Sequence, residues 1–462
     1  MASTFGGINT ALTSLYSQRR GLDVAGQNIA NANTEGYTRQ RAVMQADTGF
    51  IAPAMWARTD GVGAGVGVSS VQRLRDDFLE TRGRSEHERS AYLTDQTAAY
   101  NAIEDVFNEP NSAALQAQLH DMWGGWSDVA NNPDSVAARS SLIEKSRTVV
   151  HVLHASHDAL AGQWSANRSR LEVYAGQVNT AAKAIAQLND SIVQALSAGG
   201  TVNELQDQRD LHLMHLAELA GATTSKRPNG AVDVFLGNSA LVSEFTTSEI
   251  EVIGATQLAE QAGDNVGVGW KGLEPLAAPP GGTMGSIVNT MTEIIPGLSE
   301  DLDDVAADLF TTVNDEHLAA FGLDGVDGRA FFSGTTAETI EVAVAGPTEV
   351  AASATAAQTF DGSIADRLSS SGAQASGPDK RYQDMIAQLG VVAQTSARRA
   401  DIQRNVAEQL DAAREAQSGV NIDEEMTNLL TFQRGYEAAS RVLTTVDSML
   451  DQLINRTGLV GR

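Results

Sequence analysis

The feature that most constrains the fold is a seven-residue repeat of apolar side chains at both ends of the chain. A repeat of seven keeps one apolar seam on one side of a slightly underwound helix. The N-terminal seam consists of Ile8, Leu12, Leu15, Leu22 and Ile29. The C-terminal seam consists of Ile422, Leu429, Phe432, Tyr436, Leu443, Val446, Leu450 and Leu453. Two such seams predict terminal helices that pair with each other or with neighbouring copies of the chain.

Local signals indicate where the C-terminal helix begins and ends. Asn421 suits the N-cap position, and acidic residues occupy 423–425, the first turn, where the helix dipole favours negative charge. Gly458 is the candidate stop signal. The C-terminal helix is therefore predicted to fill most of the segment 421–462.

The stretch from Asn28 to Tyr37 is expected to end the N-terminal helix. Asn31, Asn33 and Gly36 suit a turn that needs unusual backbone angles. We therefore predict a candidate assembly interface that joins Asn31, Asn33, Gly36 and Tyr37 to the two apolar seams.

Between the terminal segments, helical and strand-like patterns alternate. Residues 71–222 contain few Gly or Pro, and two long helices are expected there, at 135–157 and 168–196. After Gly221, and again at 340–344, apolar residues alternate with polar ones, which predicts antiparallel strands. Helical patterns return after each of these two stretches.

These patterns predict a mainly α fold with an inserted β-rich module. The terminal helices would pair as a coiled-coil inner layer. This assembly region would be helical in the assembled state and disordered before assembly. A helical stalk would carry an outer antiparallel β module. The expected bounds are 1–70 with 421–462 for the assembly region, 71–222 with 283–328 and 379–420 for the stalk, and 223–282 with 329–378 for the β module.

Charge and composition exclude several classes of protein. The 462 residues carry 32 Lys and Arg against 58 Asp and Glu, a net charge of −26. Nucleic-acid binding needs a basic face, so no nucleic-acid partner is expected. There is no apolar run of about 18 residues, so no membrane insertion is expected, and no cleaved signal peptide is recognised. The absence of cysteine excludes disulfides and thiolate chemistry.

Two histidine clusters are the strongest candidates for chemistry. They consist of His151, His154 and His157 with Asp158, and of His212 with His215. Helical spacings of three and four could hold a metal, but a His-x-x-His pattern without a Glu base is not a metalloprotease signature. The glycine-rich segment 61–67 lacks the spacing of a nucleotide-binding loop and predicts a turn and a strand. We therefore predict no enzyme activity, catalytic residue, cofactor or metal.

Several motifs resemble those of one family. The segment Asn28–Gln40 and the segment Val420–Asn455 resemble the paired terminal signatures of flagellar rod, hook and hook-associated proteins. The middle of the chain resembles the FlgK family of hook-associated proteins. The motifs that carry this second resemblance are Phe107–Pro110, Trp126–Asp134 with Ala137–Arg139, Leu205–Asp210, Val232–Asn238, Thr312–Asn314 with His317, and Phe331-Phe332.

This resemblance implies a structural subunit of the bacterial flagellum that forms the junction between the hook and the filament. It implies self-association in a ring or tube at the hook tip, with the hook protein and the next hook-associated protein as neighbours. It also implies export through the flagellar type III apparatus without a cleaved signal peptide, an extracellular location, and a cytoplasmic export chaperone on the C-terminal region. A chain without cysteine cannot form disulfides that would obstruct its passage through a narrow channel.

Three alternatives remain open at this stage. A hook or rod protein shares the terminal signatures but is not expected to contain the motifs of the helical middle. A surface enzyme would use the histidine clusters. A cytoplasmic coiled-coil scaffold fits the composition but leaves the paired terminal signatures unexplained.

Overall fold

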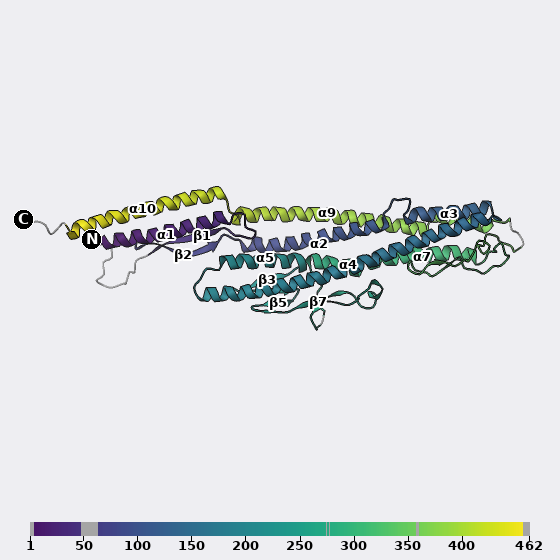
Figure 1. The fold of residues 1–462 in the computed structure, drawn as a ribbon, viewed down its shortest axis with the longest axis horizontal. Coiled ribbons are helices and arrows are strands. Elements are labelled where there is room, and N and C mark those ends of the chain that lie inside the picture. The colour runs from purple at the N-terminus through teal and green to yellow at the C-terminus, as the bar shows by residue number, and fades with distance from the viewer. Residues whose placement is uncertain (1–3, 48–62, 274, 277, 357–359, 456–462) are drawn as a thin grey trace, which may run out of the picture.

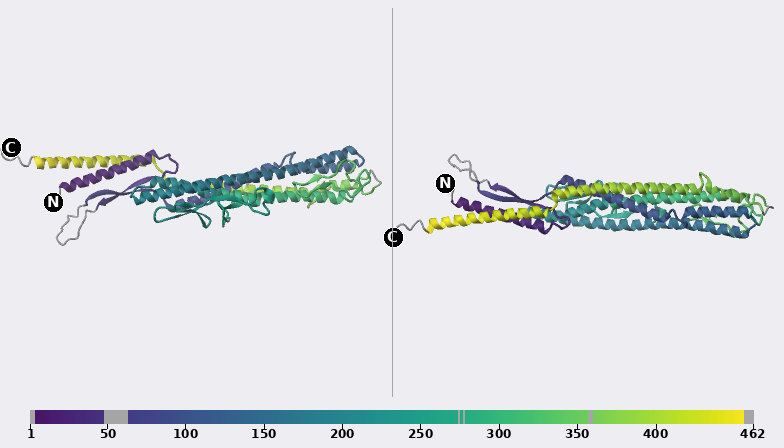
Figure 2. Two further views of the ribbon diagram at one scale, coloured as in Figure 1. Left: turned by 60° about the horizontal axis from the view of Figure 1, so that its bottom comes forward. Right: turned by 90° about the horizontal axis from the view of Figure 1, so that it is seen from above.

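The protein is an elongated molecule in which both ends of the chain lie at the same end of the long axis (Figure 1). The computed structural model describes residues 4–47, 63–273, 275–276, 278–356 and 360–455. Gly458, the expected stop signal, lies outside these residues. Two terminal helices extend from a thicker body, and Figure 2 shows the same arrangement from two further directions.

Helices make up most of the described chain. In chain order they are α1 (Thr4–Ala30), α2 (Asp77–Phe107), α3 (Leu115–Asn131), α4 (Val136–Ser197), α5 (Asn203–Ala220), α6 (Gly282–Asn289), α7 (Ile295–His317), α8 (Ser363–Ser369), α9 (Pro378–Ser418) and α10 (Ile422–Asn455). The π-helical segment Thr290–Ile294 joins α6 to α7. The mainly α fold predicted from the sequence is therefore confirmed.

The strands are short and antiparallel. They are β1 (Gln40–Asp47), β2 (Gly65–Arg73), β3 (Thr223–Lys226), β4 (Val232–Leu236), β5 (Ser239–Ser243), β6 (Thr246–Thr247), β7 (Ile250–Ile253), β8 (Gly267–Trp270), β9 (Phe332–Ser333) and β10 (Glu341–Val342). They form a four-stranded sheet in the order β3-β4-β5-β6 and three pairs, β1-β2, β7-β8 and β9-β10.

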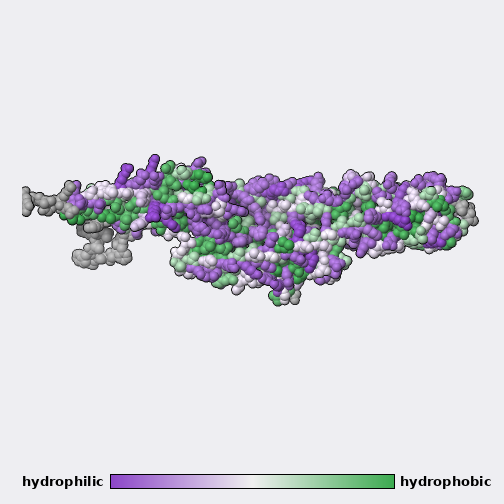
Figure 3. Space-filling model, viewed as in Figure 1, coloured by the Kyte–Doolittle hydropathy of each residue, from purple (hydrophilic) through white to green (hydrophobic). Residues whose placement is uncertain are grey.

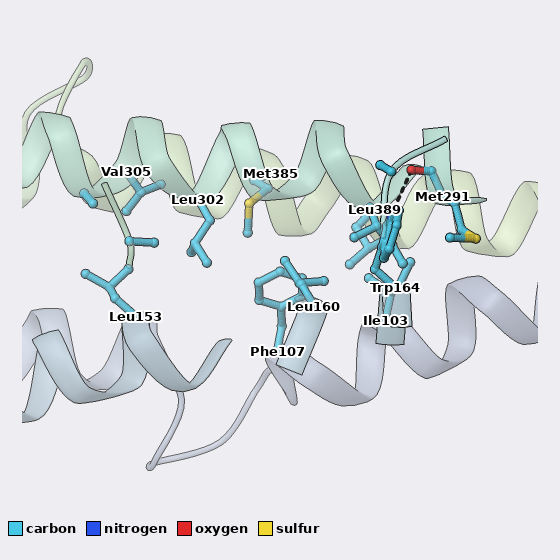
Figure 4. Close-up of a cluster of buried hydrophobic side chains, with 14 of the residues drawn as sticks. Ile103, Phe107, Leu153, Leu160, Trp164, Met291, Leu302, Val305, Met385 and Leu389 are labelled. Atoms are coloured by element: carbon cyan, nitrogen blue, oxygen red, sulfur yellow. Dashed lines mark hydrogen bonds between the residues drawn. The ribbon is translucent and has the colours of Figure 1, made fainter. Parts of the chain in front are cut away.

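The helices α2, α4, α7 and α9 form the stalk, and their apolar faces meet in its core (Figure 4). The core is anchored by Trp164 on α4, which is fully buried and donates its indole N–H to the carbonyl of Met291 at 3.0 Å. A buried tryptophan needs such a partner because an unsatisfied polar group in an apolar core is destabilising. In Figure 4, Ile103 and Leu389 lie beside Trp164, and Phe107, Leu160, Leu302 and Met385 continue the core along the stalk.

A single helix spans the two segments in which separate helices were expected. α4 runs from Val136 to Ser197, 62 residues, and begins where the Ser135 hydroxyl accepts a hydrogen bond from the Ala138 amide. No proline interrupts it. Its strongest helix-weakening residues are Gly162 and Gly176, each of which lowers helix stability by about 1 kcal/mol relative to alanine. Tertiary packing along the whole helix outweighs that cost.

The two β segments pack on different stretches of α4. Asn189 and Asn179 of α4 hydrogen-bond the backbone of the first segment at Val232 and Ile250, at 2.8 Å each. The second segment lies on the other half of α4, where His154 contacts the Ile340 carbonyl. The two segments predicted as one module, 223–282 and 329–378, thus lie along one long helix, and their grouping into one domain stays a prediction.

In the described residues of the segment 1–70, which was expected to be helical, α1 is the one helix. Its second half supplies β1 and most of β2, which pair from Gln40–Arg73 to Asp47–Gly65. Glycines alternate with Val66 and Val68 here, a pattern that disfavours helix and suits a strand.

Candidate assembly surface

The terminal helices α1 and α10 pair in an antiparallel register that several contacts fix. Gly7 faces Val446, Gly21 faces Phe432 and Asn28 hydrogen-bonds Glu425. A residue seven or fourteen positions further along α1 therefore contacts a residue the same number of positions earlier on α10. A seven-residue repeat on both helices produces this regularity.

The small residues of α1 lie at the centre of this interface. A side-chain carbon added to Gly21 would lie 2.8 Å from the ring of Phe432, and one added to Gly435 would lie 2.7 Å from Gln18. Glycine on one helix opposite a large side chain on the other allows the two backbones to approach closely. On α1, the line of closest contact therefore lies one position before the residues of the predicted N-terminal seam.

The predicted seam residues flank this central line. On α1, Ile8, Leu15, Leu22 and Ile29 are half-buried and Leu12 is exposed. On α10, Leu429, Phe432, Leu443, Val446 and Leu450 are half-buried, whereas Ile422 and Tyr436 are exposed. The side chain of Leu453 lies outside the described residues. The structure thus brings the two seams to one interface, and it leaves part of each seam accessible.

The opposite face of α1 packs against the β1-β2 ribbon. Ser17 donates its hydroxyl to the Val66 carbonyl at 2.9 Å, and Asn9 donates to the Ala64 carbonyl at 3.3 Å. Ala11 and Ala25 are buried beside them. α1 is therefore held between the ribbon and α10, which explains why its buried positions carry small side chains.

A buried asparagine ties the end of α1 to the start of α10. Asn28 donates to Glu425 at 3.0 Å, exchanges hydrogen bonds with the backbone of Gln40, and accepts from the Tyr37 hydroxyl at 2.9 Å. Arg39 completes the cluster through an ion pair with Glu425 at 2.7 Å. Burial, together with the nearby carboxylates, raises the pKa of Tyr37, so its hydroxyl stays a donor.

The turn after α1 forms as the sequence predicts. Of the three expected turn residues, only Gly36 has a positive φ angle, 76°, and a side-chain carbon there would lie 2.6 Å from Leu211 of α5. Asn31 accepts from Thr34 at 3.2 Å, and Asn33 is exposed. Gly36 is therefore the position at which the turn touches the stalk.

A network of charged side chains joins the terminal pair to the stalk. Asp207 accepts from the Thr38 amide at 3.1 Å and pairs with Arg73 at 2.7 Å. Arg75 bridges Asp210 and Glu80, and Glu80 also pairs with Arg414 of α9 at 3.1 Å. Sequence reasoning missed this junction, although Asp207 and Asp210 belong to the motif Leu205–Asp210 and could have been found there.

The histidines of the two clusters have different surroundings. His154 contacts a backbone carbonyl, and His157 lies 3.7 Å from Asp158. Burial lowers the pKa of His212, and His215 lowers it further. Within the described residues there is no group of three or more His, Asp or Glu side chains that could hold a metal ion. In that same part of the chain, no helix is both long and apolar enough to cross a membrane.

Large apolar side chains remain uncovered on the terminal pair. Figure 3 shows apolar residues gathered over α10 near its first turns. The large apolar side chains of α1 and α10 that are at least 41% exposed are Tyr16, Ile422, Met426, Leu430, Tyr436, Val442, Met449 and Ile454. We call this set the apolar flank. A patch of this kind on an extended helix pair marks a surface for protein contacts.

Comparison with known proteins identifies the family. Residues 100–332, half of the chain, match the family model described as the flagellar hook-associated protein FlgK helical domain. The chain belongs to the FlgK family. The stalk from the end of α2 to β9 thus corresponds to the FlgK helical domain. Residues 8–38 match the model of the flagella basal body rod protein, and residues 414–456 match the C-terminal model of the flagellar basal body rod FlgEFG proteins.

Whole-chain relatives agree with this FlgK assignment. The chain is 29% identical to flagellar hook-associated protein 1 of Bacillus subtilis over the full length of both. It is 26% identical to flagellar hook-associated protein 1 of Escherichia coli, where the match covers 71% of this chain and 59% of that protein. The solved structure of the flagellar hook junction protein FlgK from Burkholderia pseudomallei superimposes with a TM-score of 0.63 at 14% identity, covering 72% of this chain and 99% of that one.

Proposed function

We infer that this chain is a structural subunit of the flagellar hook–filament junction, on which the next hook-associated protein and the filament assemble. The single observation that carries this inference is the match of the stalk to the FlgK helical domain. A hook or rod protein, the alternative left open by the terminal signatures, loses its support because the middle of the chain has this match. The role is mechanical, with packing rather than chemistry at its centre.

The proposed assembly mode is a ring or tube of identical copies at the hook tip. The apolar flank supports it, because Leu430 and its neighbours lie on the outside of the terminal pair, where another copy can cover them. Burying an apolar side chain of this size contributes roughly 1.5–3 kcal/mol. The hook protein and the next hook-associated protein would contact the two ends of such a ring.

Export would precede assembly. We propose that the chain leaves through the flagellar type III apparatus, without a cleaved signal peptide, and reaches an extracellular location at the tip of the hook. A cytoplasmic chaperone would cover α10 before export. The exposure of Met426, Leu430 and Met449 supports this step, because such an apolar surface favours aggregation in a free chain.

The function is tested by removing the chain from its cells. We expect hooks without filaments by electron microscopy, together with unassembled filament protein in the culture medium. Cells without hooks would instead place the chain in the hook or rod, and normal filaments would contradict the junction role. Re-expression of the chain should restore attached filaments.

Leu443→Asp is expected to block incorporation at the hook tip and to leave the stalk folded. Leu443 is a half-buried residue of the α10 seam, so the substitution places a carboxylate in that apolar seam, whereas the stalk core contains no α10 residue. Filament attachment in complemented cells and the melting temperature of the purified chain are the measurements. Thr444→Asp adds the same charge at an adjacent exposed position and should assemble normally. Equal behaviour of the two variants would count against the seam.

A further inference from the structure

A cavity of about 140 Å³ lies where α2, α5 and the β3-β4 hairpin meet, next to the end of β2. It is separate from the apolar flank. Its walls come from the first turns of α2, from α5 between Gln206 and Leu213, and from the backbone at Gly230 and Ala231. Several water molecules would fit in a space of this size.

The cavity collects positive charge in a chain that is strongly acidic overall. Six of the 32 basic residues of the protein line it, against three acidic ones. The basic residues are Arg73, Arg75, Arg84, Arg209, Lys226 and Arg227, and the acidic ones are Asp77, Glu80 and Asp210. Acids just outside the wall balance part of this excess, because Arg73 pairs with Asp207 and Arg227 pairs with Asp233 and Glu244.

The lining acids already have partners. Asp210 pairs with Arg73 and Arg75, Glu80 pairs with Arg75, and Asp77 pairs with Lys226 at 2.5 Å. Arg227 is held by Asp233, which lies outside the cavity wall, at 2.8 Å. Two arginines, Arg84 and Arg209, make no direct ion pair among the described residues, and Asp210 attracts both from a greater distance.

Arg209 is 4% exposed and is only partly satisfied. Its Nη1 donates to Asn189 at 3.0 Å and to the Gly230 carbonyl at 2.8 Å, but its buried Nε has no hydrogen-bond partner in the described part of the chain. A buried guanidinium without a counter-ion is costly. Burial lowers the pKa of Arg209, and the attraction of Asp210, opposed by the repulsion from Arg73 and Arg75, does not restore it.

Arg84 faces the same space from α2. Its Nη2 donates to the hydroxyls of Thr81 and Thr224, at 3.3 and 3.2 Å. These hydroxyls are neutral, so they position the guanidinium without balancing its charge. Burial again lowers the pKa of Arg84, and the more distant Asp210 and Glu80 offset this lowering only in part.

From this arrangement we propose that the cavity binds a small inorganic dianion of the phosphate or sulfate class. Arg84 and Arg209 would supply its charge-assisted hydrogen bonds, and the hydroxyl of Thr224 would hold Arg84 in place. Arginine suits this role because its planar fork matches the spacing of two oxyanion oxygens. The bound ion would link α2, α5 and the β3-β4 hairpin next to the charged junction with the terminal pair.

The proposal is tested by titrating the purified full-length chain with inorganic phosphate in a calorimeter, with sodium chloride holding the ionic strength constant. We expect one saturable site in the wild type and at least tenfold weaker binding in Arg84→Gln. Arg89→Gln is the matched control, because Arg89 lies on the same helix, has a 63% exposed side chain and does not line the cavity. It should bind phosphate as the wild type does.

Thr224→Val provides a second variant that keeps the shape of a strand residue, and it should weaken binding several-fold. Absence of saturable binding in the wild type would overturn the proposal, as would equal weakening in Arg84→Gln and Arg89→Gln, which would indicate diffuse attraction only. If acetate binds as tightly as phosphate, the site selects a carboxylate, such as an acidic side chain of a neighbouring copy, and the dianion assignment fails.

Discussion

Replacing Gly21 with valine is expected to separate the terminal helices and to reduce the fraction of hooks that carry filaments by roughly tenfold or more. Gly21 faces the ring of Phe432, and even one added carbon would lie 2.8 Å from that ring. Inserting atoms into a packed interface costs roughly 1–3 kcal/mol, and about 1.4 kcal/mol is a factor of ten in an equilibrium constant. The clash acts in any state in which the helices pair in this register.

Gly26→Val is the matched control for this experiment. Gly26 lies on the same helix, and a side-chain carbon there would have no neighbour within 4 Å. Both substitutions carry the same helix-propensity change, so the difference between them reports the contact with Phe432 alone. Filament attachment and the melting temperature of the stalk are the readouts. If Gly26→Val impairs attachment as much as Gly21→Val does, the close approach of the helices is not what assembly needs.

The period of the terminal seams could be predicted from sequence, but their phase could not. A search for apolar repeats finds large apolar side chains, so the seam in the sequence is defined by Ile8, Leu15, Leu22 and Ile29. In the structure the centre of the interface is occupied by Gly7, Gly21 and Asn28, which carry no hydrophobic signal. The closest approach of two helices uses the smallest residues, and their partners are known only once the second helix is in place.

The helices of the body could be predicted from the sequence, whereas the place where its β segments pack could not. Long runs without proline indicate helix, although one helix of 62 residues could not be distinguished from two. Local alternation reveals strands such as β4, but not which stretch of α4 they will cover. The contacts that decide this, such as Asn189 with Val232 and His154 with Ile340, involve polar residues without any periodic pattern.

The charged junction escaped prediction on similar grounds. Asp207 lies 134 residues after Arg73, and Glu80 lies far from its partner Arg414, while each residue is of a type common on solvent-exposed surfaces. The structure buries them together, where paired charges with good geometry hold three segments of the chain in register. The junction lies next to the cavity of Arg84 and Arg209, where six of the 32 basic residues of this acidic protein meet.

His317 occupies the aromatic core at the far end of the stalk from the terminal pair and is fully buried. Its Nδ1 donates to the Arg329 carbonyl at 2.7 Å, and its Nε2 accepts from the Ala351 amide at 2.8 Å. The rings of Trp126 and Phe331 pack beside it, at 6.3 and 5.3 Å between centroids. These contacts require the neutral imidazole, because a protonated Nε2 could not accept the Ala351 amide.

Burial lowers the pKa of His317 to about 4, from an ordinary value near 6.5. Between pH 6.5 and pH 4 the imidazole is therefore protonated in the unfolded chain and neutral in the folded chain. The contribution of His317 to the free energy of unfolding is complete above pH 6.5 and is lost as the pH falls towards 4. The expected loss is about 3 kcal/mol between pH 7 and pH 4. Urea unfolding followed by tryptophan fluorescence, with Trp126 next to the site, measures it.

His317→Gln separates this effect from the other titrating groups. The variant should be less stable than the wild type at pH 7, because glutamine does not reproduce both hydrogen bonds, and the difference should shrink by about 3 kcal/mol on acidification to pH 4. The buried carboxyls of Asp207 and Asp379, whose pKa values burial raises, titrate in both proteins and cancel in the comparison. Parallel pH profiles for the two proteins would show that His317 is not the group that makes the stalk acid-sensitive.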